Sequence, residues 1–140
     1  MTARALAVAL AVALLSGCDA NPFDEAEVPV VTVQAGAPPS FTWAPDGAQL
    51  LRVYRGDRAG DGYGPDLVWS VAAADGRNGL RGPVAYGVEP PGADTDWPPR
   101  ALGEGQTFTV EVRRFDAAGS GDGFTNTRND YVGTATFVAE

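Results

Sequence analysis

Three kinds of side chain that carry much of enzyme chemistry are scarce or missing in this 140-residue chain. It has no histidine and no lysine, because all ten basic residues are arginines, and its one cysteine is Cys18. Without histidine a serine or cysteine nucleophile lacks its usual base, and without lysine neither a Schiff base nor a Ser-Lys dyad can form. We therefore predict a protein that is not an enzyme and that uses no cofactor.

Positive charge is scarce as well. The ten arginines face eighteen acidic residues, which gives a formal net charge of -8. Without Arg4, in the N-terminal segment, nine arginines face the same eighteen acids and the net charge is -9. An acidic surface without a basic stripe repels phosphates, so nucleic acid is excluded as a partner.

Residues 1–17 have the pattern of a bacterial export signal. Arg4 supplies a basic start, and the apolar run from Ala5 to Leu15 is too short to span a bilayer as a permanent helix. The closing stretch Leu15-Ser16-Gly17-Cys18 resembles the lipobox of bacterial lipoproteins: an aliphatic residue, two small residues and a cysteine. That resemblance implies cleavage between Gly17 and Cys18 and acylation of Cys18, for example with palmitate. Two or three acyl chains, at about 0.8 kcal/mol per buried CH₂, make such an anchor effectively permanent.

The lipobox predicts attachment to the bacterial cell envelope through an N-terminal lipid. We expect the outer membrane, with the domain facing the periplasm or the cell surface. Residues 18–27 are polar and acidic, without strand or helix periodicity, and are expected to form a flexible tether after the lipidated cysteine. The acids next to Cys18 resemble sorting signals of two bacterial groups that imply different destinations, so the membrane and leaflet stay open. The expected partner is an envelope protein or a glycan.

Residues 28–140 are predicted to be a single antiparallel β-sandwich. Apolar and polar residues alternate with period two, and Gly, Pro and Asp interrupt the alternation at short intervals. Phe108, Val110 and Val112 are expected to point inward together, as are Leu67, Trp69 and Val71, and Val84, Tyr86 and Val88. The proline-rich residues 89–100 are expected to be a connection. About seven strands are predicted, over residues 30–33, 40–43, 49–55, 67–73, 83–88, 107–115 and 131–138.

Two stretches of this region resemble fibronectin type III domains. The run from Leu102 to Val112 (LGEGQTFTVEV) is similar to that family's approach to its sixth strand, with a leucine, a glycine three residues later and an aromatic residue six later. Trp43 followed by Pro45, then Leu51 and Val53, is similar to its second and third strands. The sequence departs from the family at Phe108, where a corner tyrosine is usual, and in residues 89–100. The resemblance implies a fibronectin type III or immunoglobulin-like sandwich, and a fold does not carry a function with it.

The loop 57–66 contains weak candidates for a calcium site, Asp57, Asp61 and Asp66, because Ca²⁺ binds six to eight oxygen ligands. It is no EF-hand, since Ala59 and Val68 occupy the third and twelfth positions. A looser site with Asp122 stays open beside the simpler reading of a solvated turn. The three glycines at 60, 62 and 64 form no phosphate loop, because no helix follows them.

Aromatic residues offer a second kind of candidate site. Tyr63, Trp69, Tyr86 and Trp97 could together stack on sugar rings, but Trp69 and Tyr86 lie in strand patterns and are expected in the core. Trp97, between Asp96 and two prolines, is therefore the candidate ligand-binding residue. Carboxylate pairs such as Asp94/Asp96 and Glu104/Glu111 could in principle serve glycoside hydrolysis, but nothing in the sequence places them in a cleft and we assign them no catalytic role. The sequence thus predicts a binding or structural module, with a carbohydrate- or calcium-binding module as the alternative.

The lipobox yields a direct test. Replacing Cys18 with serine removes the acylated atom, so Cys18→Ser should accumulate as an unprocessed or mislocalised precursor, and any mature form should be released without detergent. Mass spectrometry and membrane fractionation measure both effects. An unchanged mass and an unchanged membrane fraction would contradict the lipoprotein assignment.

Overall fold

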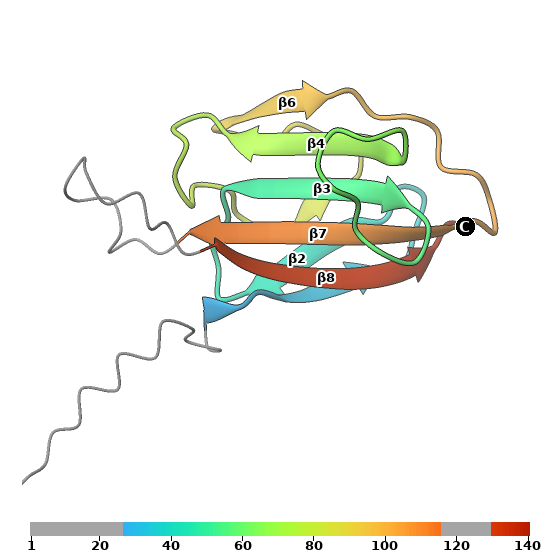
Figure 1. Cartoon of the computed structure of the whole chain (residues 1–140), viewed down its shortest axis with the longest axis horizontal. Coiled ribbons are helices and arrows are strands. Elements are labelled where there is room, and N and C mark those ends of the chain that lie inside the picture. The colour runs from blue at the N-terminus through green and yellow to red at the C-terminus, as the bar shows by residue number, and fades with distance from the viewer. Residues whose placement is uncertain (1–26, 116–129) are drawn as a thin grey trace, which may run out of the picture.

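The computed structural model describes residues 27–115 and 130–140 as two antiparallel β-sheets packed face to face (Figure 1). This confirms the predicted all-β sandwich. Gly17 and Cys18, the tether up to residue 26, and Asp122 lie outside the described residues. No helix in the described part of the chain is long and apolar enough to cross a membrane.

The described residues form eight strands. The smaller sheet has the order β1-β2-β5, and the larger has the order β6-β4-β3-β7-β8. All neighbours pair antiparallel. The strands are β1 (Val30–Gln34), β2 (Ser40–Ala44), β3 (Leu50–Arg55), β4 (Leu67–Ala73), β5 (Val84–Ala85), β6 (Ala93–Trp97), β7 (Thr107–Phe115) and β8 (Asp130–Val138).

Six of the predicted strands occur within one residue of their expected bounds. The expected strand 83–88 shrinks to the two residues of β5, because Pro83 has no N–H to donate and the chain turns at Gly87, whose φ is 76°. The predicted common face of Val84, Tyr86 and Val88 is therefore wrong at its last member. Val84 and Tyr86 are buried, whereas Val88 lies beyond the turn and is 54% exposed.

The prediction that residues 89–100 form only a connection is also wrong. Residues Ala93–Trp97 are strand β6, which pairs with β4 at the edge of the larger sheet. Its sequence, ADTDW, has no run of apolar residues, because the strand lies at an edge and Asp94, Thr95 and Asp96 are exposed. A period-two hydrophobic pattern cannot identify such a strand.

The core lies between the two sheets and has aromatic rings at its centre. Phe137 contacts Phe41 and Phe108, with ring centroids 5.6 and 5.7 Å away. Trp69 meets the ring of Tyr86 edge-on at 5.1 Å. The predicted inward positions Phe108, Val110 and Val112 are buried, as are Trp43, Leu51 and Val53, so these predictions are confirmed.

One predicted face is broken by a β-bulge. Val53 pairs with Trp69, but Tyr54 pairs with Leu67, so Val68 is the extra residue. The bulge moves Leu67 to the same side of the sheet as Tyr54, opposite to Trp69 and Val71. The expected common face of Leu67, Trp69 and Val71 is therefore wrong for Leu67. Leu67 is still fully buried, because the outer side of this sheet is covered too.

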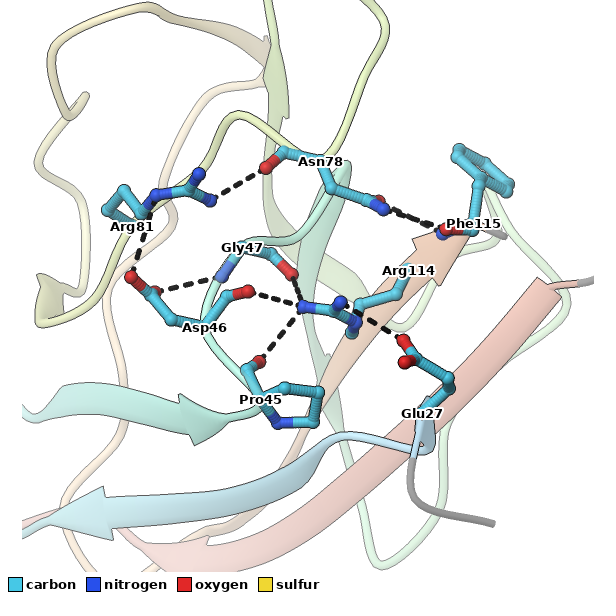
Figure 2. Close-up of polar contacts among 8 residues, drawn as sticks. All are labelled: Glu27, Pro45, Asp46, Gly47, Asn78, Arg81, Arg114 and Phe115. Atoms are coloured by element: carbon cyan, nitrogen blue, oxygen red, sulfur yellow. Dashed lines mark hydrogen bonds and ion pairs between the residues drawn. The ribbon is translucent and has the colours of Figure 1, made fainter. Parts of the chain in front are cut away.

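At one end of the sandwich, Arg114 ties three segments together (Figure 2). It continues the inward face of β7 beyond Val112 and lies at the margin of the core. Its Nη1 donates to the carbonyl oxygens of Pro45 at 3.0 Å, Asp46 at 2.5 Å and Gly47. Its Nη2 is 3.2 Å from a carboxylate oxygen of Glu27. One guanidinium thus holds the turn between β2 and β3 and the start of the described chain.

Asn78 and Arg81 extend this network (Figure 2). The side-chain amide of Asn78 makes two hydrogen bonds to the backbone of Phe115. Its Oδ1 accepts from the Phe115 N–H at 2.9 Å, and its Nδ2 donates to the Phe115 carbonyl at 2.7 Å. Arg81 donates to the Asn78 carbonyl at 2.7 Å and lies 3.5 Å from a carboxylate oxygen of Asp46. Position 47 has room for glycine alone, because a Cβ there would lie 2.2 Å from Nη1 of Arg81 and 2.8 Å from the backbone carbonyl oxygen of Asn78.

Removing the Arg114 guanidinium should destabilise the domain. Arg114→Met leaves three carbonyl groups without their charged donor, so we expect a loss of about 1.5–3 kcal/mol in the free energy of unfolding. Arg81→Met is the matched control, because the Arg81 side chain is 59% exposed and its removal should cost under about 1 kcal/mol. Urea unfolding of the full chain measures both. Equal losses in the two variants would contradict a central role for Arg114.

Candidate functional site

The outer face of the larger sheet is covered by the loop that joins β3 to β4, residues 56–66. In Figure 1 this green segment passes in front of β4, β3 and β7. The loop is fixed at both ends: Gly56 donates its N–H to the Thr107 carbonyl at 2.8 Å, and Arg55 donates to the Asp66 carbonyl at 2.7 Å. Thr109 adds a hydrogen bond from its hydroxyl to the Gly56 carbonyl at 2.9 Å.

Because of this cover, β3 is buried on both faces. Tyr54, on the outer face, is almost fully buried, and a Cβ at Gly60 would lie 3.1 Å from its ring. Thr109 and Glu111 of β7, which sequence alternation places outward, are also buried, and Glu111 is only 3% exposed. Burial raises the pKa of the Tyr54 hydroxyl, and the nearby Glu111 carboxylate raises it further, so the phenol stays protonated at neutral pH.

Strand register brings four polar or aromatic residues into one row across the outer face. Arg52 is paired with Glu111 on one side and with Ser70 on the other, and Ser70 is paired with Trp97. Glu111 bonds to Arg113, with 3.1 Å between Oε1 and Nη2. Arg52 instead lies against the loop, with its guanidinium carbon 4.9 Å from the ring centroid of Tyr63.

The exposed end of this row is a cluster that we call the ring patch: Tyr63, Trp97, Arg52, Arg100 and Asp96. The ring centroids of Tyr63 and Trp97 are 6.1 Å apart, with their planes inclined by 45°. The Arg100 guanidinium lies 5.7 Å from the Trp97 ring centroid. The Tyr63 hydroxyl is 3.5 Å from a carboxylate oxygen of Asp96, and Tyr63 is 60% exposed.

The two arginines of the ring patch are held in different ways. Burial lowers the pKa of the Arg52 guanidinium, but the side chains of Tyr54 and Tyr63 raise it by more, so Arg52 remains a cation. Arg100 is exposed, and its backbone is fixed: its N–H donates to the Val68 carbonyl at 2.9 Å and its carbonyl accepts from the Tyr86 hydroxyl at 2.6 Å. Burial is the main cause that raises the pKa of Tyr86 to about 12, so this donor keeps its proton.

The structure places the sequence candidates for a sugar platform in two groups. Trp69 and Tyr86 are buried and pack against each other, which confirms their expected core role. Trp97 is half-buried at the sheet edge and has Tyr63 beside it. Sequence reasoning did not connect Arg52 with Trp97, because the pairing of β4 with both β3 and β6 brings their strands to the same face. It also missed Arg100, which the hydrogen bond from its N–H to Val68 of β4 holds beside the Trp97 ring.

The candidate calcium ligands lie on the covering loop. Asp57, Asp61 and Asp66 line an open polar groove of about 570 Å³, together with Arg55 and Arg58. A carboxylate oxygen of Asp57 lies 3.8 Å from Nε of Arg58, and both side chains are largely exposed. Across residues 27–115 and 130–140, no group of three acidic side chains is arranged to hold a metal ion.

The two carboxylate pairs considered for hydrolysis also lie in unlike surroundings. Asp94 and Asp96 are exposed on the edge strand β6. Glu104 is exposed in the turn before β7, whereas Glu111 is buried on β7 and bonded to Arg113. Neither pair lines the groove beside the loop 56–66 or the apolar groove described next.

A second groove, of about 230 Å³, lies at the end of the sandwich opposite Arg114. It is lined by Pro38, Pro39, Tyr86, Leu102 and Ala139, among others, and is mainly apolar. The Tyr86 hydroxyl in its wall is already bonded to Arg100 and Val68, so this groove offers few free polar groups to a ligand.

Comparison of the chain with protein-family models, with curated proteins and with solved structures finds no significant match.

Next to the ring patch, Glu89 closes the open edge of β6. One of its carboxylate oxygens accepts from the Thr95 N–H at 2.8 Å and from the Thr95 hydroxyl at 2.6 Å. An unpaired edge N–H can recruit another strand, and here a carboxylate blocks it. These hydrogen bonds lower the pKa of the exposed Glu89 below its ordinary value.

The Glu89 contact should depend on pH. Because folding lowers the pKa of Glu89, its ionised carboxylate contributes fully to the stability of the fold above the ordinary pKa of 4.5. That contribution is lost as the pH falls through the lower pKa of the folded state. We expect the amide resonance of Thr95 to titrate in NMR spectra with a midpoint below 4.5. Glu89→Gln should abolish that transition and leave the amide of Val71, inside β4, unaffected. A midpoint at or above 4.5 would contradict the contact.

Proposed function

We propose that this chain is a non-catalytic, lipid-anchored protein of the bacterial cell envelope that acts as a binding or structural module. The lipobox Leu15-Ser16-Gly17-Cys18 supports the anchor, and the acidic stretch that follows it, up to residue 26, supplies a tether of suitable composition, whereas Glu27 is held by Arg114. The absence of histidine and lysine from the whole sequence supports a role without catalysis.

The ring patch is the observation that carries the binding role. Tyr63 and Trp97 expose aromatic area on the outer face of the larger sheet, and the guanidinium groups of Arg52 and Arg100 lie over their rings. Aromatic and arginine side chains are enriched at binding surfaces, because they provide large contact areas with few rotatable bonds and directional hydrogen bonds. We take this patch as the ligand-contacting face of the module.

The order of the strands supports a fibronectin type III-like assignment. The first, second and fifth strands form one sheet, and in the other the third strand lies between the fourth and the seventh, as in sandwiches of the immunoglobulin type. Two features depart from the family pattern. Strand β6 is an additional edge strand, and Phe108 stacks on Phe137 where a corner tyrosine is usual.

A carbohydrate-binding surface module is the second candidate function. The adjacent rings of Tyr63 and Trp97 favour it, with the carboxylate of Asp96 at hydrogen-bonding range of the Tyr63 hydroxyl. Calcium binding is the other alternative. Among the described residues, no group of three carboxylates is arranged to hold a metal ion.

Site-directed photo-crosslinking in intact cells tests the module role. A photoreactive phenylalanine analogue at position 63 should form crosslinks to an envelope component, whereas the same group at position 30 should not. Val30 is a suitable control because it is 70% exposed but belongs to the smaller sheet. Protease treatment of the same cells, before and after the envelope is opened, identifies the side of the membrane. Equal crosslinking from both positions would contradict the assignment of the ring patch as the contact face.

A further inference from the structure

We propose that the ring patch binds an uncharged glycan. This inference rests on the binding role proposed above and adds the chemical class of the ligand. It depends on three properties of the patch: its two rings, the polar groups around them, and the charge of its surroundings.

The two rings provide stacking surfaces of limited size. Tyr63 is exposed, Trp97 is half-buried, and their planes differ by 45°, so a chain lying on both must turn between successive contacts. The C–H faces of sugar rings pack on aromatic rings, and neighbouring sugars in a glycan are rotated about their linkage. Two inclined rings about 6 Å apart suit such a ligand better than a flat aromatic one.

The groups beside the rings complement hydroxyl groups. Arg100 has an exposed guanidinium with N–H donors, and it has no carboxylate partner among the described residues. Asp96 is exposed and presents acceptor oxygens. A sugar hydroxyl both donates and accepts, so one ligand can use both residues while it stacks on Trp97.

The surrounding charge favours an uncharged ligand. Three carboxylates lie on or next to β6, those of Glu89, Asp94 and Asp96, and the chain after residue 17 carries a net charge of -9. Of the two arginines in the patch, Arg52 is half-buried under the loop. An anionic polymer would therefore meet more negative than positive charge here.

The apolar surface of the patch is too small for a typical protein partner. The large exposed hydrophobic residues of the described chain are Val28, Val30, Tyr63, Val88, Val132 and Val138, and Tyr63 is the one in the ring patch. Protein interfaces surround their aromatic anchors with a larger closely packed area. A ring pair with charged groups on one side and the exposed Pro98 and Pro99 on the other fits a sugar instead.

The patch is also held in place before a ligand arrives. Trp97 is on a strand, and the Tyr63 ring lies against the Arg52 guanidinium. The backbone of Arg100 is fixed because its N–H donates to the Val68 carbonyl and its carbonyl accepts from the Tyr86 hydroxyl. Binding to such a site does not require the loop to be ordered first, which reduces its entropic cost.

Titration of the full-length chain in detergent with hexamers of β-linked glucose and of N-acetylglucosamine tests the proposal. Trp43 and Trp69 are buried, so quenching of tryptophan fluorescence by acrylamide reports mainly on Trp97, and a bound sugar should protect it. We expect at least one neutral hexamer to bind. Isothermal titration calorimetry compares the variants, because Trp97→Ala lacks the fluorescent reporter. Tyr63→Ala and Trp97→Ala should each weaken binding about tenfold or more, equivalent to about 1.4 kcal/mol. Val30→Ala, an exposed residue on the other sheet, should bind like the unmodified chain.

Three results would overturn the glycan assignment. The first is that neither neutral hexamer binds at concentrations up to 10 mM, which limits the binding free energy to about 3 kcal/mol at most. The other two are equal binding by the ring variants and Val30→Ala, and tighter binding of an anionic uronate hexamer. The photo-crosslinking experiment separates this failure from a failure of the proposed function. Crosslinks that form from position 63 and not from position 30 would leave the module role intact with a ligand of another class. Circular dichroism of each variant verifies that it is folded.

Discussion

Burial of the central strand β3 on both faces is the constraint on which the rest of the structure depends. Its inner residues Leu51 and Val53 face the smaller sheet, and its outer residues Leu50 and Tyr54 are buried as well. The described residues, 27–115 and 130–140, form no third layer of secondary structure over that outer side. The loop 56–66 takes that place, and its glycines let the backbone approach closely, as at Gly60 against the Tyr54 ring.

The ring patch follows from the same constraint. Once the loop lies over β3, Tyr63 is placed between Arg52 below it and Trp97 beside it. A loop rich in glycine and aspartate, which in sequence suggests either a solvated turn or a cation site, is thus a structural cover. Its acidic residues face outward, where water solvates them at little cost, and its tyrosine joins the sheet surface.

The borders of the sandwich are closed by polar contacts of different kinds. At one edge of the larger sheet, the carboxylates of Glu89 and of the two aspartates of β6 oppose pairing with another strand. At the other edge the Pro29 carbonyl lies so close to Gly133 of β8 that a Cβ there would overlap it, so the residues just before β1 lie against this strand. Arg114 binds the turn between β2 and β3 at one end. Arg114 is buried and has a structural role, in a chain with only ten cationic side chains. Arg100 has no carboxylate partner among the described residues, so its exposed side chain is the cation that the ring patch offers to a ligand.

The sequence by itself determined the fold class and most strands, because period-two alternation reports directly on a strand with one buried face, as in Phe108, Val110 and Val112. It also singled out Trp97, from its polar and proline-rich surroundings. Only the tertiary structure decided the rest. The edge strand β6 has no hydrophobic period, the bulge at Val68 moves Leu67 to the opposite face, and Glu111 is buried although its position in the alternation is polar. Arg52 and Trp97 are 45 residues apart in the chain and lie on either side of Ser70 because β4 pairs with both of their strands. Strand register and loop cover arise from contacts between distant segments, and local sequence patterns carry no record of those contacts.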